Sequence, residues 1–262
     1  MTKNKTFAIV LSIVFALVLV VALGHSVFRV GKIELVAHTT TNHLAALTES
    51  TVLSSSKLNK GKSVFLLDRN SYINNLEKEQ PYIQMLSLEV VYPNTVKFHY
   101  AEREELFVIK LKDGAVAYLD TEFKVLKVVD EAYTTTQQNP VLIEANLNLS
   151  SSDVQAGDFL DKDNFFDYLN LKQAYSSIGY SVPQIKAMIS SAVVEQTQDG
   201  DLLTLNTYLG VKIQILNAGY YTAEKVSLAY GHLQKLTQSQ CSSGAIYVFK
   251  NNKSIIESRY IA

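Results

Sequence analysis

The sequence predicts an α+β fold that follows one N-terminal transmembrane helix. Three observations support this prediction. Residues 6–24 form an apolar run without charge, residues 30–103 read as β-α-α-β-β, and from Leu106 onward the apolar residues recur mainly with the period of two that strands have. We therefore expect a small α+β domain, followed by a larger β-rich domain with two helices.

The apolar run at residues 6–24 has the sequence TFAIVLSIVFALVLVVALG. At about 1.5 Å per residue, a helix of this length covers roughly 28 Å, which matches the hydrocarbon core of a bilayer. Lys3 and Lys5 precede the run without an acid, so the positive-inside bias places residues 1–5 in the cytoplasm. The alternative is a cleaved signal peptide, because Ala22-Leu23-Gly24 resembles a cleavage site. Both interpretations export the rest of the chain.

Composition excludes some function classes. The 262 residues include 24 Lys and Arg against 25 Asp and Glu, without a basic stripe, so we expect no nucleic acid partner. The single cysteine, Cys241, cannot form an intrachain disulfide. An exported chain of this kind must be stabilised by its own core.

The small domain begins with a strand, which the alternation at residues 30–37 predicts. A short helix is expected at residues 44–51, with Asn42 as its N-cap, and the serines at 54–56 indicate a loop. A second helix is expected at residues 69–79.

A β-hairpin around Pro93-Asn94 is the clearest pattern in the small domain. We expect one alternating set to form its apolar face, and His99 to point the other way. The set consists of Leu86, Leu88, Val90, Tyr92, Val96, Phe98 and Tyr100. Phe98 and Val90 should share a core with Leu76.

The larger domain is predicted to start with a meander of strands that turns at Asp113-Gly114. A helix is expected at residues 164–178, and a strand is expected to start at residue 185. Two more strands follow, and then a helix capped by Thr222. A terminal hairpin ends with a strand at residues 254–260.

No pattern indicates an active site. Gly61-Lys62-Ser63 resembles the end of a phosphate-binding loop, but Ser56 stands where the first glycine belongs. The five histidines include no pair at a metal-binding spacing such as H-x-x-x-H, and no G-x-S-x-G motif is present. The 15 Tyr and 11 Phe fall on core positions rather than in one exposed binding stripe. We expect no enzyme activity, no catalytic residue, no cofactor and no metal.

An ordered series of segments resembles the FtsQ/DivIB family of bacterial cell-division proteins. The segments are V-G-K-I-E-L-V at 30–36, G-K-S-V-F-L-L-D at 61–68, P-Y-I-Q-M-L-S-L-E-V-V-Y-P-N-T-V-K-F-H-Y-A-E-R at 81–103, A-Y-L-D at 117–120, A-E-K-V at 223–226 and G-A-I-Y-V at 244–248. Two positions depart from the family pattern, since Glu105 replaces a usual proline and Tyr247 a usual aspartate.

The resemblance implies a particular order of domains. Residues 1–5 would be a cytoplasmic tail, 6–24 the transmembrane helix, 25–104 a POTRA domain (β-α-α-β-β) and 105–262 an extracytoplasmic β domain. The protein would then be a single-pass type II protein of the cell membrane, located at the division septum.

The resemblance also implies a function. The protein would be a non-enzymatic divisome scaffold that binds bitopic coiled-coil division proteins and, through them, the septal peptidoglycan synthase, and so supports septal peptidoglycan synthesis. We expect binding by β-augmentation on the last strand, which has no successor to cover it. The predicted binding residues are Ser254, Ile255, Ile256, Glu257, Ser258, Arg259 and Tyr260. The alternatives are an exported enzyme and an exported, membrane-anchored adhesin or lipid-binding module.

Overall fold

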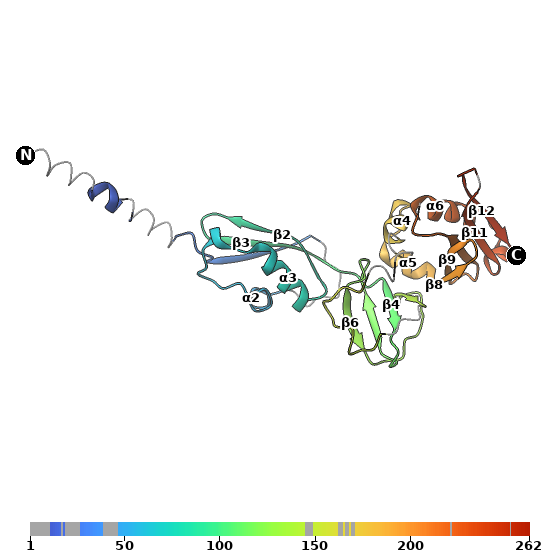
Figure 1. The fold of residues 1–262 in the computed structure, drawn as a ribbon, viewed down its shortest axis with the longest axis horizontal. Helices are drawn as coiled ribbons and strands as arrows, with labels where there is room; N and C mark the ends of the chain where they lie inside the picture. The colour runs from blue at the N-terminus through green and yellow to red at the C-terminus, as the bar shows by residue number, and fades with distance from the viewer. Residues whose placement is uncertain are drawn as a thin grey trace, which may run out of the picture. The chain divides into compact units, whose positions relative to one another are not determined.

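The computed structural model of the chain describes residues 11–16, 18, 27–38, 47–144, 149–161, 165, 168, 171–220, 222–251 and 253–262. The chain divides into two compact units, Met1–Arg103 and Glu104–Ala262 (Figure 1). Each unit has its own hydrophobic core.

The predicted transmembrane helix at residues 6–24 lies largely outside the described residues, which include only 11–16 and 18 of it. These residues are helical, and their apolar side chains are exposed. In the described parts of the chain, no helix is both long enough and apolar enough to cross a membrane. The membrane anchor therefore stays a prediction.

The first unit contains a three-stranded sheet in the order β1-β3-β2. The elements are β1 (Lys32–Ala37), α2 (Glu49–Ser56), a 3-10 turn (Val64–Leu66), α3 (Arg69–Glu79), β2 (Ile83–Val91) and β3 (Thr95–Glu102). Strand β3 pairs in parallel with β1 and antiparallel with β2. The sequence of strands and helices is the predicted β-α-α-β-β, and α3 has the predicted bounds.

The core of the first unit lies between this sheet and the two helices. Leu76 of α3 and Phe98 of β3 are both fully buried in it, and Val90 packs against it at its margin. The prediction that these three side chains share one core is confirmed. Tyr72, one turn before Leu76, buries its ring in the same core.

The first helix begins later than the sequence predicted. Helix α2 starts at Glu49 and includes the serines at 54–56, which were expected to form a loop. Its N-cap is Thr48, whose Oγ1 accepts a 3.2 Å hydrogen bond from the Thr51 amide. Within the helix, Ser56 Oγ donates to the Val52 carbonyl, which satisfies the buried hydroxyl. The predicted cap and first turn fall at residues 42–46, outside the described residues.

A β-bulge between Met85 and Ser87 changes which β2 side chains face the core. Met85 is buried before the bulge and Leu88 after it, whereas Leu86 is 51% exposed. The prediction that Leu86 lies on the apolar face is wrong, because the bulge adds one residue and shifts the alternation. Tyr92, at the turn, is also exposed, contrary to its predicted place on that face.

The second unit is built on a nine-stranded sheet in the order β12-β11-β10-β9-β8-β7-β4-β5-β6. Its strands are β4 (Phe107–Lys110), β5 (Val116–Leu119), β6 (Val125–Val129), β7 (Val141–Ile143), β8 (Ile189–Thr197), β9 (Gly200–Thr207), β10 (Lys212–Leu216), β11 (Ala245–Lys250) and β12 (Ile256–Ile261). Its helices are α4 (Leu171–Ser177), α5 (Val182–Met188), α6 (Thr222–Leu233) and α7 (Gln238–Cys241). Where two helices were predicted, the described residues contain these four.

Helix α5 occupies the start of a segment that was predicted to be a strand. Ser181 and Gln184 form a capping box, in which the Ser181 amide donates to Gln184 Oε1 at 2.8 Å. Pro183 stands in the first turn, where its missing N–H costs nothing. Strand β8 therefore starts at Ile189 rather than at Ile185.

Helix α6 covers one face of the sheet near β10, β11 and β12. Its buried side chains include Val226, Ala229 and Leu233, which the sequence predicted as its inner face. Lys225 is also buried, and its Nζ donates to the carbonyls of Leu216 and Asn217 at 2.7 and 2.6 Å. These bonds fix the start of α6 to the end of β10.

Candidate partner-binding edge

The predicted binding residues lie at the edge of the large sheet. Strand β12 is the terminal strand in the sheet order and pairs antiparallel with β11 (Figure 1). Among the described residues, no strand pairs with its other side. Residues 256–260 of the predicted set belong to this strand. Ser254 and Ile255 precede it in the turn, where Ser254 has a φ of +62°.

Asn251 holds the turn before β12 in one conformation. Its Oδ1 accepts hydrogen bonds from the amides of Lys253 and Ile255, at 2.9 and 3.0 Å. Its own amide donates to the Ile255 carbonyl at 2.8 Å. The last bond makes residues 251 and 255 a hydrogen-bonded pair of the β11–β12 ladder.

The register then shows which backbone groups of β12 are free. Phe249 pairs with Glu257 and Tyr247 pairs with Arg259. Hydrogen-bonded pairs alternate with non-bonded pairs in an antiparallel ladder, so Glu257 and Arg259 direct their amides toward β11. Ile256, Ser258 and Tyr260 consequently direct theirs toward the open edge. The three outward amides, with their carbonyls, are what an added strand would bind.

Side chains hold the edge strand against the rest of the unit. Ile256, Ser258 and Tyr260 are half-buried on the side of α6, and Ser258 Oγ lies 3.0 Å from His232 Nδ1. The Tyr260 hydroxyl donates to the Ser243 carbonyl at 3.1 Å. Gly244 has a φ of +75°, and a Cβ there would meet the Tyr260 hydroxyl at 2.6 Å. Glycine is thus required for the close approach of this loop to β12.

The opposite face of the hairpin carries aromatic side chains that the sequence interpretation assigned to the core. The rings of Tyr247 and Phe249 stack with centroids 5.4 Å apart. The Arg259 Cζ atom lies 5.4 Å from the centroid of each ring, so the guanidinium makes a cation–π contact with both. Both rings are half-buried, whereas Ile246 and Val248, which alternate with them along β11, are fully buried. The alternation with these aliphatic residues is the sequence signal that could have placed the aromatics outside.

An open groove of about 640 Å³ lies between α6 and the half-buried face of β12. Its lining residues are Glu224, Ser227, Leu228, Gly231, His232, Lys235 and Ser258. A strand added to β12 would direct alternate side chains to this side of the sheet. The groove therefore offers both charged and apolar contacts next to the free edge.

The other sequence candidates have structural roles. Lys62 Nζ donates to the Tyr72 hydroxyl at 2.5 Å, so the lysine of the loop that resembles a phosphate-binding motif is held by a core residue of the first unit. Cys241 is half-buried in α7 and packs against the core of the second unit. Within the described ranges, no group of three or more His, Cys, Asp or Glu side chains is placed to hold a metal ion.

Comparison with known proteins agrees with this architecture. A family model described as "POTRA domain, FtsQ-type" matches residues 40–103. The Cell division protein DivIB of Clostridium acetobutylicum is 29% identical over 99 residues, which are 38% of this chain and 32% of the relative. The match thus spans about a third of the curated relative's length. The resemblance to the FtsQ/DivIB family that the ordered motifs predicted is confirmed: residues 40–103 match an FtsQ-type POTRA domain, and part of the chain is similar to a DivIB protein.

Proposed function

We propose that this protein is a membrane-anchored, non-enzymatic scaffold of the bacterial division machinery. The FtsQ-type POTRA domain and the similarity to a cell-division protein support a role in cell division. The charge-free run at residues 6–24 supports a single-pass anchor with the N-terminus in the cytoplasm. No observation favours the adhesin, the lipid-binding module or the exported enzyme over this role.

The observation that carries the proposal is the open edge of β12. Three outward-facing backbone positions, at Ile256, Ser258 and Tyr260, lie on a strand that is held in place by side chains. An extended partner segment would bind them by main-chain hydrogen bonds, and its side chains would provide selectivity. The groove beside α6 and the Tyr247–Phe249–Arg259 surface offer contacts on the two faces of such a strand.

The proposed partners are bitopic coiled-coil division proteins, whose short extracytoplasmic ends would supply the added strand. Through them the scaffold would hold the septal peptidoglycan synthase at the septum. A fluorescent fusion of the full chain should then gather at mid-cell during division. A fusion spread evenly over the membrane would contradict this location.

Substitutions at Ser258 test the binding mode. Ser258→Pro removes an outward-facing N–H and obstructs an incoming strand, while an edge position tolerates proline within the fold. We expect this variant of the full chain to lose co-purification of the bitopic partners and to keep a cooperative melting transition. Ser258→Ala is the matched control, because it removes the same hydroxyl and keeps the amide. It should still co-purify the partners, with only the small loss of affinity that the Ser258–His232 bond accounts for, and retention by Ser258→Pro as well would exclude this edge.

A further inference from the structure

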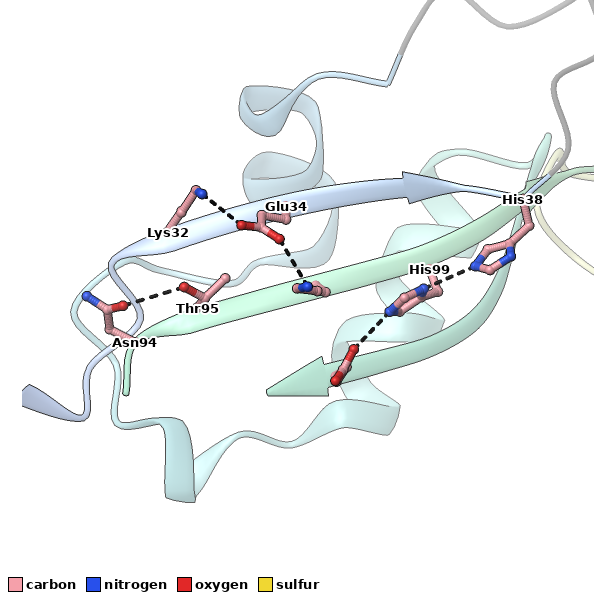
Figure 2. Close-up of polar contacts among 8 residues, drawn as sticks. Lys32, Glu34, His38, Asn94, Thr95 and His99 are labelled. Atoms are coloured by element: carbon pink, nitrogen blue, oxygen red, sulfur yellow. Dashed lines mark hydrogen bonds and ion pairs between the residues drawn. The ribbon is translucent and has the colours of Figure 1, made fainter. Parts of the chain in front are cut away.

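Two histidines that are far apart in the chain meet on the open face of the POTRA sheet. His38 follows β1 and His99 lies in the adjacent strand β3, and Figure 2 shows their rings side by side. His38 Nε2 is 3.1 Å from His99 Nδ1. The other nitrogen of the second ring, His99 Nε2, is 3.1 Å from Glu89 Oε2 of β2. The three side chains form a row that runs from the residue after β1, across β3, to β2.

The carboxylate of Glu89 determines which nitrogen of the His99 ring carries the proton. An ionised carboxylate only accepts hydrogen bonds, so His99 Nε2 must carry the proton that it donates to Glu89. In the neutral imidazole, the lone pair is then on Nδ1, and this atom faces His38. A carboxylate behind the distal nitrogen is the usual outer support of a histidine that binds a metal.

The distance between the two facing nitrogens suits a shared cation. Zn²⁺ binds imidazole nitrogen at about 2.0–2.1 Å, and tetrahedral geometry then separates two such nitrogens by about 3.3 Å. His38 and His99 are within a few tenths of an ångström of this separation. His38 needs only to move its single proton from Nε2 to Nδ1, so a neutral pair binds the cation without a change in total protonation.

We propose that His38 and His99 form a surface site for a divalent cation that prefers imidazole ligands, such as Zn²⁺ or Cu²⁺. Glu89 orients His99 from behind, and water completes the coordination. The site is open to solvent on one side, since His38 is exposed, so the cation has a direct path to it.

The backbone holds the ligands in place before the cation arrives. The His38 amide donates to the Tyr100 carbonyl at 2.9 Å, which extends the parallel pairing of β1 and β3 by one residue. The nearest lysine along the His99 face, Lys97, pairs with Glu34 at 3.4 Å. Lys32 pairs with the same carboxylate at 2.7 Å (Figure 2). Both ammonium groups are therefore partly neutralised, which reduces their repulsion of a cation.

A bound cation would clamp the end of β1 to β3. Strand β1 ends at Ala37, so the site lies directly after the last residue of β1 that pairs with β3. This inference does not depend on the partner-binding edge, which belongs to the other unit.

The test is a titration of the metal-free full chain, purified in detergent without a histidine tag, with ZnCl₂ by calorimetry. We expect saturable binding that His38→Ala and His99→Ala each weaken about tenfold or more. Glu89→Ala should weaken it by roughly 10–100-fold, through loss of the outer support. His232→Ala is the matched control, because its ring also accepts or donates one hydrogen bond but faces a serine, and it should bind Zn²⁺ unchanged.

Electron paramagnetic resonance with CuSO₄ reports the number of nitrogen ligands on the cation, which a change in protein stability alone would not alter. The wild-type spectrum should show two nitrogen ligands, and the His99→Ala spectrum one. Unchanged affinity and spectra in both His38→Ala and His99→Ala, in protein that melts normally, would overturn the proposal. Absence of saturable Zn²⁺ binding to the wild-type chain would overturn it as well.

Discussion

Ser258 Oγ lies 3.0 Å from His232 Nδ1, and this hydrogen bond joins the middle of β12 to α6. The bond uses side chains alone, so it leaves the Ser258 backbone available at the sheet edge. An edge strand without such support tends to fray, and ordering it would then reduce the free energy of binding. The Ser258–His232 contact thus keeps β12 ordered for the proposed addition of a partner strand.

A double-mutant cycle measures this contact. Ser258→Ala and His232→Ala should each destabilise the second unit, and the double variant should lose less than their sum. We expect a coupling free energy of about 0.5–1.5 kcal/mol, the usual net value of one hydrogen bond. Denaturant melts of the four proteins provide the measurement. Strictly additive losses would mean that the two side chains do not interact in solution.

Proline substitutions at adjacent positions test the register of β12. Arg259 directs its amide toward β11, so Arg259→Pro should remove a ladder hydrogen bond and lower the melting temperature of the second unit by several degrees. Ser258→Pro should lower it much less, because its amide faces the open edge.

Arg259→Pro also removes the guanidinium that lies over Tyr247 and Phe249. Arg259→Ala removes the guanidinium but keeps the backbone amide, so it measures the side-chain contribution alone. It should cost about 0.5–1 kcal/mol, the usual size of an exposed cation–π contact. If Ser258→Pro proved as destabilising as Arg259→Pro, the outward direction of the Ser258 amide would be wrong.

Phe98 and Leu86 test the bulged packing of the POTRA sheet. Phe98 is fully buried, and Phe98→Ala should cost roughly 3–5 kcal/mol of unfolding free energy through the lost contacts and the cavity. Leu86→Ala should change the unfolding free energy by about 0.5 kcal/mol or less, because the bulge leaves Leu86 51% exposed. Similar losses for both variants would contradict the bulge at Met85.

The sequence alone predicted the elements that depend on local signals. The two strands of the hairpin around Pro93 and the apolar stripe of α6 each appear where the sequence placed them. Strand β12 lies at the edge of the sheet, as predicted. The capping box at Ser181 is local as well and could have identified α5, although a strand was predicted from residue 185.

Other features depend on contacts between distant residues. The bulge at Met85 follows from the pairing of β2 with β3, and neither strand alone indicates it. His38 and His99 are 61 positions apart, so a search for metal-binding spacings along the chain could not find them. The parallel pairing of β10 with β11 likewise depends on the connection that contains α6, which returns the chain to the same end of the sheet.

Asp113 provides a pH-dependent contact in the second unit. Its Oδ2 accepts hydrogen bonds from the Ser151 amide and hydroxyl, at 2.8 and 2.6 Å. These bonds favour the carboxylate and hold the pKa of Asp113 below its ordinary value. A depressed pKa means that the contribution to stability is present at neutral pH and is lost as the pH falls through the lowered value.

The Ser151 amide resonance should therefore titrate with a midpoint below about 3.9, the ordinary value for aspartate. Asp113→Asn should abolish this titration. The Ser150 amide donates to Asp153, so its resonance should still follow the titration of the Asp153 carboxylate in that variant. A midpoint at or above the ordinary value would show that the Asp113–Ser151 bonds do not form.

Arg103, the second residue of the Glu-Arg pair at 102–103, joins the end of the POTRA domain to α3. Its side chain is 5% exposed, and its Nη2 lies 3.2 Å from Glu77 Oε2 of α3. The other Glu77 oxygen accepts a 2.7 Å bond from the Met85 amide, next to the bulge. Glu77 thus joins the helix, the bulged strand and the end of the domain.

Glu77→Ala would leave a buried guanidinium and a buried amide with weaker partners. We expect it to cost about 3–5 kcal/mol, the loss that follows when one member of a buried ion pair is removed. Glu77→Gln should cost less, because the amide oxygen can still accept from Met85. Glu34→Ala is the control, since its pairs with Lys32 and Lys97 are more exposed and screened by solvent, so it should lower the unfolding free energy far less than Glu77→Ala. If Glu77→Ala and Glu34→Ala lowered the unfolding free energy equally, the Glu77–Arg103 pair would not anchor the POTRA fold.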